Sequence, residues 1–283
     1  YLAPLPLFIL GLKKDNHWCG LVGAFAAVAL FIITTPQMSI MYLLAIAAPT
    51  TFFCEKAVSR TGTSLKGWYS LSKLSLLLIV PPSFCFVLLT AYFWLYGQGL
   101  GFVFIEKTNE IFDLYITALK GQGQNINPSL SKQLDGVKKS FADTAPALIS
   151  IFWMSLIVLN GLIAQSILKK SNRNQRPSFA IREVQIPRSF AVIFLSSLAL
   201  ASFSSGELGY LVTNLTAILA FPVMLTGLGV IHTFADKTNY SGSILLVLYL
   251  IIMFSRWAAI FVVLVGIADH FLKLRNKVQA DKV

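Results

Sequence analysis

Residues 208–231 read LGYLVTNLTAILAFPVMLTGLGVI, a stretch without a single charged side chain. A helix that rises 1.5 Å per residue needs about 20 such residues to cross about 30 Å of hydrocarbon. In lipid, backbone N–H and C=O groups must bond within their own segment, which an α-helix allows. The stretch therefore predicts a transmembrane helix.

The same pattern recurs along the chain. Apolar runs lie at residues 18–34, 37–54, 74–96, 145–168, 189–204 and 241–272, the last of which contains Arg256. Of the 283 residues, 56% are hydrophobic and 12% are charged, about half the charged share of a soluble domain. We predict an all-α, polytopic transmembrane helix bundle of about eight membrane segments, with residues 1–283 forming a single membrane domain.

The chain begins at Tyr1 inside an apolar run, so we expect it to be N-terminally truncated. Prolines interrupt later runs at Pro81, Pro82 and Pro222. They should kink those helices, either as plain bends packed against neighbours or as openings to a cavity.

The formal charge is +11, and the basic residues gather in short connections between apolar runs. They are Lys13 and Lys14, then Lys56, Arg60, Lys66 and Lys73, then Lys169, Lys170, Arg173, Arg176, Arg182 and Arg188, and finally Lys273, Arg275, Lys277 and Lys282. Positive loops face the cytoplasm and its anionic lipids. We therefore predict a bacterial inner-membrane protein with cytoplasmic loops 55–73 and 169–188, a cytoplasmic C-terminal tail and no nucleic-acid partner.

The long connection 97–143 balances its acidic and basic residues, which suits the extracytoplasmic side. Apolar residues at helical spacing predict an amphipathic helix around 111–119 and a second one beginning at Pro128. We expect residues 99–143 to form an extracytoplasmic amphipathic helical insertion. It would lie on the membrane surface or act as a lid over an outward-facing cavity.

The last run, 241–272, is too short for two full crossings, yet both flanks belong on the cytoplasmic side. We favour a helical hairpin or a sharply bent helix around Phe254–Trp257. Arg256 would then sit at the turn near the interface, and the alternative is a buried cationic site.

Polar side chains at membrane depth are the natural candidates for ligand binding because they are costly there. The tentative ligand-binding residues are Asn160, Gln165, Asn214, His232 and Arg256. Asn160, Gln165 and Asn214 have an alternative role as interhelical hydrogen-bond partners. His232 lies four residues before Asp236, an arrangement that suits a proton relay or, alternatively, a helix-end contact with the dipole.

The sequence holds no motif for catalysis. It contains no nucleophile elbow, HExxH, Walker motif or paired carboxylates, so we expect no enzyme, no catalytic residue and no cofactor. Cys19, Cys54 and Cys85 lack metal-ligand spacing, and we expect buried, inert thiols and no metal site. The Gly97–Gly101 cluster follows an apolar run, and a helix exit explains it better than a phosphate loop.

Short segments resemble the YybS-like family of uncharacterised bacterial membrane proteins. They are Tyr1-Leu-Ala-Pro-Leu-Pro-Leu-Phe8, Asn160-Gly-Leu-Ile-Ala-Gln165, Ile186-Pro-Arg188, Gly227-Leu-Gly-Val-Ile-His232, Gly266-Ile-Ala-Asp269 and Leu274-Arg275. That family is distantly similar to the S components of energy-coupling-factor transporters. The resemblance implies capture of a small ligand and an ATPase-driven partner, without transferable ligand residues.

Our leading functional hypothesis is small-solute binding or transport of the S-component type, in a helix-lined cavity open to the outside. The alternative is a non-enzymatic membrane scaffold or assembly factor. Small residues at Gly20, Gly23, Ala24 and Ala27 would let helices approach closely, either inside the chain or against another membrane protein. The expected partners are the lipid bilayer, an unidentified small molecule and further membrane proteins.

Overall fold

The computed structural model describes residues 1–13, 17–60, 67–121, 128–177 and 179–275. Within these ranges the regular structure is helical, apart from an isolated bridge between Arg60 and Trp68. The expected all-α class is confirmed. The predictions made for Lys14, Lys66, Lys277 and Lys282 lie outside the described residues.

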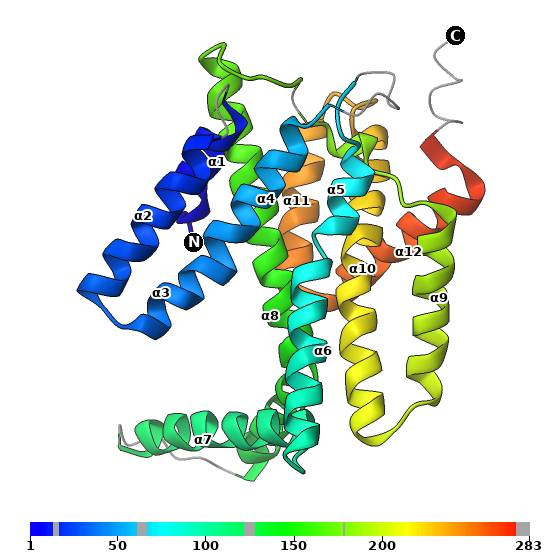
Figure 1. Ribbon diagram of the computed structural model, residues 1–283. Coiled ribbons are helices and arrows are strands. Elements are labelled where there is room, and N and C mark those ends of the chain that lie inside the picture. The colour runs from blue at the N-terminus through cyan, green and yellow to red at the C-terminus, as the bar shows by residue number, and fades with distance from the viewer. Residues whose placement is uncertain (14–16, 61–66, 122–127, 178, 276–283) are drawn as a thin grey trace. The chain divides into compact units, whose positions relative to one another are not determined.

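The elements follow one another as a chain of helices (Figure 1). They are α1 Pro4–Leu12, α2 His17–Ile33, α3 Pro36–Tyr42, the π-helical turn η1 Leu43–Ala47, α4 Ala48–Val58, α5 Leu71–Leu77, α6 Val80–Leu95, α7 Leu100–Gly121, α8 Pro128–Lys170, the 3-10 turn η2 Ile181–Glu183, α9 Arg188–Phe203, α10 Gly206–Ala235, α11 Ser241–Phe254 and α12 Arg256–Leu272. Two compact units are formed, one by residues 1–81, 152–191 and 220–283, the other by residues 82–151 and 192–219.

By length and composition, four of the described helical stretches can cross a membrane. They are Pro36–Val58, Leu71–Leu95, Ser131–Lys170 and Gly206–Ala235. The bent pair α11 and α12 makes a fifth if it counts as one span, and the apolar stretches Trp18–Ile33 and Arg188–Phe203 are shorter. The chain is thus a helical membrane protein with four to five candidate spans, and a count of about eight is not confirmed.

Large apolar side chains on these helices point away from the protein. Phe25, Phe84, Ile193 and Phe203 are exposed, the last by 89%. Meanwhile Asn160 is 0% exposed. Such an inside-out distribution suits a lipid solvent, because hydrocarbon solvates apolar side chains and excludes polar ones.

Small residues near the N-terminus allow two helical segments to pack closely. A Cβ atom added to Gly23 would lie 3.1 Å from the Cβ of Ala47. The Ser39 hydroxyl donates a hydrogen bond of 2.7 Å to the Ala27 carbonyl. The small-residue face that includes Gly23 and Ala27 therefore packs within the chain, which settles for these two residues the choice left open by the sequence.

The second amphipathic helix expected at Pro128 is not a separate helix, and that prediction is wrong in this respect. It forms the first part of α8, which continues through Pro146 to Lys170. A proline removes one helical hydrogen bond and frees the carbonyl four residues earlier. Here the Tyr210 hydroxyl donates to that carbonyl, on Ala142, at 3.2 Å. The freed group has a partner, and the helix continues.

The first amphipathic helix is confirmed as α7, which lies across the end of α6 in Figure 1. It exposes Ile111, Leu114 and Tyr115. Before it, Gly97 adopts a positive φ of 73° after the end of α6, as expected for a helix exit. The backbone N–H of Gly101 donates to the Glu207 carboxylate at 3.2 Å, so the glycine cluster holds a carboxylate of the protein itself.

The last apolar run turns back on itself, as the sequence favoured. The axes of α11 and α12 are bent by 119° at Ser255. Before α11, Asp236 pairs with the Arg182 guanidinium at 2.6 Å, and after α12, Arg275 donates to the Arg182 carbonyl at 2.7 Å. Both ends of the run therefore lie near the same residue, as expected if the run returns to the side from which it started.

The return of this run predicts the accessibility of single cysteines. Asn239→Cys and Lys273→Cys should both react with a membrane-impermeant maleimide from one side, and Ser205→Cys from the other. Ser205 precedes α10, a helix of 30 residues and so about 45 Å long, whose opposite end lies near Asn239.

Only the exposed Cys85 must be replaced for this experiment, because Cys19 and Cys54 are buried. The measurement compares labelling of intact spheroplasts with labelling of permeabilised ones. Labelling of positions 239 and 273 from opposite sides would contradict the hairpin.

Candidate ligand-binding site

Several residues of the connection between α8 and α9 are hydrogen-bonded to other segments of the chain. We call residues 179–185 the strap. The N–H of Phe179 donates to Gln165 Oε1 at 2.8 Å, and the N–H of Gln185 donates to Ser72 Oγ at 3.0 Å. Because loops lack the internal hydrogen bonds of a helix, such external partners fix their path.

The central part of the strap is bound by Arg275. Its Nη1 donates to the carbonyls of Arg182 at 2.7 Å and Val184 at 2.9 Å, and its Nε donates to Asp269 Oδ2 at 2.8 Å. Asp269 also accepts the backbone N–H of Arg275 at 3.1 Å. Both side chains are buried. A buried ion pair is costly unless it gains further hydrogen bonds, and this one has three of them besides its direct contact.

Glycines bring α10 and α12 close together beneath this ion pair. A Cβ on Gly227 would collide with the Val262 carbonyl oxygen, and one on Gly266 with the Val223 carbonyl oxygen. A Cβ on Gly229 would lie 2.7 Å from the Ile181 carbonyl oxygen, so this glycine lets the strap approach α10. Segments singled out by the family resemblance therefore meet here, although they lie far apart in the sequence.

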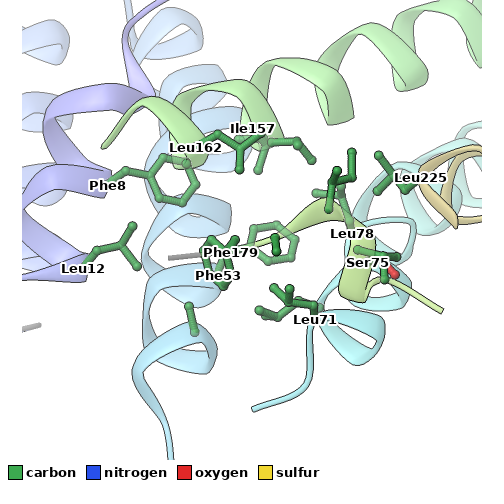
Figure 2. Close-up of a pocket in the computed structure, with 17 residues that line it drawn as sticks. Phe8, Leu12, Phe53, Leu71, Ser75, Leu78, Ile157, Leu162, Phe179 and Leu225 are labelled. Atoms are coloured by element: carbon green, nitrogen blue, oxygen red, sulfur yellow. The ribbon is translucent and has the colours of Figure 1, made fainter. Parts of the chain in front are cut away.

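The strap covers an apolar cavity of about 140 Å³ (Figure 2). Its walls come from α1, α4, α5, α8, α10 and the strap, with Phe8, Phe53, Leu78, Ile157 and Phe179 among the lining residues. An engineered apolar cavity of about 150 Å³ holds benzene. The volume thus suits an apolar group of that size, such as part of an alkyl chain.

Among the described lining residues, Ser75 has the only polar side chain, and its hydroxyl already donates to the Ser72 carbonyl at 2.8 Å. The described side chains offer a polar solute no free partner in this cavity, and losing its water would cost free energy. The cavity therefore favours an apolar ligand.

Arg176 stands at the edge of the cavity. Its Nη1 donates to the Ala57 carbonyl at 3.0 Å, and its guanidinium lies 4.5 Å from the centre of the Phe179 ring. Burial lowers the pKa of this guanidinium from its ordinary value, although arginine stays protonated at any physiological pH. Arg176 thus positions Phe179 from one side while Gln165 holds its N–H from the other.

A basic groove of about 680 Å³ lies next to the cavity walls. It is lined by Lys13, Val58, Arg60, Trp68 and residues 172–175. Lys13 directly follows Leu12, and Val58 directly follows Ala57, both of which line the cavity. The groove and the cavity therefore share the ends of α1 and α4 as walls.

Asn160 and Gln165 lie in α8 near the cavity but do not line it. The Asn160 amide donates to the carbonyls of Tyr1 at 3.0 Å and Leu156 at 2.8 Å. Gln165 accepts from the strap, as described above. Both make the interhelical or loop contacts that the sequence analysis set against ligand binding.

Asn214 belongs to the other compact unit. Its side chain bonds to backbone groups of α8 beside Pro146. Its Oδ1 accepts the N–H of Ala147 at 3.1 Å, and its Nδ2 donates to the Asp143 carbonyl at 3.0 Å. In a regular helix these two backbone groups would bond to each other. The side chain of Asn214 therefore bridges the α8 backbone beside Pro146, and both ends of the amide have partners.

His232 and Arg256 lie outside the cavity lining as well. The His232 Nε2 is 2.9 Å from the Tyr249 hydroxyl, while Asp236 pairs with Arg182. Arg256 is exposed, with its guanidinium 5.6 Å from the centre of the Trp257 ring. The five predicted site residues are thus not gathered around this cavity.

The residues that shape the cavity were missed because most of them are apolar. Phe53, Phe179 and Ile157 look like any other packing residue in a membrane sequence. The basic residues of the connections were noticed, but only as signals of orientation. The sequence offered one signal of the Asp269–Arg275 pair, a carboxylate at the end of an apolar run six residues before an arginine.

Breaking the buried ion pair should destabilise the protein. Arg275→Gln leaves the Asp269 carboxylate buried without its cation, a change that costs about 3–5 kcal/mol. We expect a clear fall in the melting temperature of the detergent-purified chain, and a smaller fall when Asp269→Asn is added. Exposed Lys273→Gln serves as the control. A melting temperature equal to that of the control would contradict the role of the pair.

The close approach of α10 and α12 predicts a second effect. Gly227→Ala and Gly266→Ala should each lower the melting temperature, because the added methyl collides with a backbone carbonyl that cannot rotate away. Gly242→Ala is the matched control, since nothing lies within 4 Å of a Cβ at that position. Equal melting temperatures for all three variants would show that the two helices separate at no cost.

Comparison with known proteins adds a family. Searches of curated proteins and of solved structures returned no match. The family model described as "Predicted membrane protein (DUF2232)" matches residues 1–270. A match over nearly the whole chain agrees with the apolar helices and their outward-facing side chains. The chain belongs to the DUF2232 family of predicted membrane proteins.

Proposed function

We propose that this protein binds an apolar or amphiphilic molecule from the membrane in the cavity beneath the strap. The observation that supports the proposal is the nearly complete lack of polar side chains among the described residues that line a cavity of about 140 Å³. An alkyl chain gives up no hydrogen bond by entering such a space from lipid. It gains dispersion contacts with rings and branched side chains that would otherwise border a void.

The strap forms one wall of the cavity and is itself fixed by hydrogen bonds. Phe179, Ala180, Ile181 and Val184 form part of the lining, and Arg275 and Gln165 hold the strap in position. A ligand that enters must fit beneath a segment whose backbone is already bonded. Preorganisation of this kind lowers the conformational entropy lost on binding.

Three hydrogen bonds within one compact unit join the connection 171–187 to α4, to α5 and to the segment that follows α12. Arg176 reaches Ala57, Gln185 reaches Ser72, and Arg275 reaches Arg182. This common position supports the proposal that loops 55–73 and 169–188 and the tail share one side of the membrane. Their positive charge supports the cytoplasmic side of a bacterial inner membrane.

Transport of the S-component type, with an ATPase-driven partner, is the extension of this proposal, in which the cavity would be the capture site. The apolar lining favours a hydrophobic cargo over a polar one. The proposal is one of binding without catalysis. The scaffold alternative draws no support from Gly23 and Ala27, because contacts inside the chain occupy both.

Filling the cavity should abolish binding. Ala180→Phe places a ring in the space beneath the strap, and Ala258→Phe on α12 is the control at another half-buried alanine. A phospholipid with a photoreactive diazirine in its acyl chain should crosslink to peptides containing Phe53 or Phe179 in the unaltered protein. The crosslink should be lost in Ala180→Phe and kept in Ala258→Phe. Equal crosslinking of both variants, located by mass spectrometry, would refute the proposal.

A further inference from the structure

The described lining of the groove beside the cavity carries a net positive charge. Lys13, Arg60 and Arg173 line it, and its described lining includes no acidic residue. Within the described ranges, these three cations form no ion pair. Two asparagines, Asn172 and Asn174, add hydrogen-bonding groups to the same lining.

Helix dipoles oppose this charge but do not cancel it. The groove lies at the C-terminal ends of α1, α4 and α8, each worth about −0.5 of an elementary charge. Three such ends amount to roughly −1.5 against three full positive charges. The cations partly offset the negative ends of the helix dipoles, as basic residues at helix ends commonly do. The remaining positive charge in the groove can attract an anion.

Because the groove borders the cavity, one ligand could place an anionic group in the groove and an apolar group in the cavity. Leu12 and Ala57 line the cavity, and the next residues, Lys13 and Val58, line the groove. Trp68 completes the groove wall, and the Arg60 guanidinium lies 5.1 Å from the centre of its ring. An apolar pocket that borders a basic groove with an aromatic wall matches a molecule that has a tail and an anionic head.

We propose that the ligand is an anionic amphiphile with a phosphate head, part of whose alkyl chain enters the cavity while the phosphate binds Lys13, Arg60 and Arg173. This inference rests on the proposed function for the tail and adds the chemical class of the head. Guanidinium groups suit phosphate because their paired N–H donors match two phosphate oxygens. We commit to a membrane lipid as the source of the phosphate.

Three probes separate the contributions of the head and the tail. Phosphatidic acid has both parts, diacylglycerol with the same chains lacks the phosphate, and glycerol 3-phosphate lacks the tails. Binding of each to the detergent-purified full chain is measured by native mass spectrometry and by thermal stabilisation, which increases with ligand concentration relative to Kd.

The variants follow the same logic. Arg60→Gln with Arg173→Gln removes two charges from the groove. Lys170→Gln with Arg188→Gln removes two exposed charges elsewhere, so it controls for general attraction to anionic lipid. Ala180→Phe blocks the cavity. All four charged positions are exposed, so neither double variant should disturb folding.

We expect phosphatidic acid to bind roughly tenfold or more tightly than diacylglycerol, as charge-assisted hydrogen bonds to phosphate imply. The groove variant should remove this difference and leave diacylglycerol binding unchanged. The control pair should change the affinity for phosphatidic acid by less than about twofold, because Lys170 and Arg188 do not line the groove and exposed charges at a distance are screened. Ala180→Phe should weaken binding of both lipids.

Other outcomes overturn the inference in distinguishable ways. Equal affinity for the two lipids, with Ala180→Phe still weakening both, would refute the phosphate head and leave the proposed function intact. If the groove variant and the control variant lost equal affinity for phosphatidic acid, the attraction would come from general surface charge. That result would also refute the phosphate site. Tight binding of glycerol 3-phosphate alone would show a site for soluble phosphate esters instead. If neither lipid binds, both proposals fail.

Discussion

Hydrocarbon offers no hydrogen bonds, so each backbone N–H and C=O at membrane depth needs a partner within the protein. Prolines make this constraint visible. Pro49 frees the Ala45 carbonyl, which accepts the Trp153 indole N–H at 2.7 Å, and Pro146 frees the Ala142 carbonyl, which accepts the Tyr210 hydroxyl. Asn214 bridges two further backbone groups of α8. Polar side chains on one helix thus complete the backbone of another, and α8 passes through its proline without ending.

The same constraint explains the strap and its buried charges. A loop beside membrane helices must find external partners for its carbonyls, and Arg275 supplies two hydrogen bonds at once. Its own positive charge requires a buried anion, which Asp269 provides from the last turn of α12. The ion pair therefore follows from the need to anchor the strap. Its position also brings the hairpin of α11 and α12 back toward the loop where Asp236 meets Arg182.

The anchored strap in turn encloses the space that we assign to a ligand. Gln165 and Arg176 place Phe179 over the cavity, so side chains that sequence reasoning treated as ligand candidates or orientation signals instead shape an apolar site. Beside it, basic residues that complement helix ends leave an excess of positive charge. An apolar cavity and a basic groove on common walls form a coherent site for an amphiphile, and neither feature alone would identify one.

The sequence determined the helical membrane class and the positions of the apolar runs. Each of these depends on hydrophobicity and length, which are local properties. It did not determine that α8 continues through Pro146, because the partners of the freed groups, Tyr210 and Asn214, lie more than sixty residues away. Nor did it show the cavity, whose walls are apolar residues indistinguishable from packing. Only the tertiary structure decides whether a polar side chain completes a backbone or meets a ligand, because that choice depends on which groups come within about 3 Å of it.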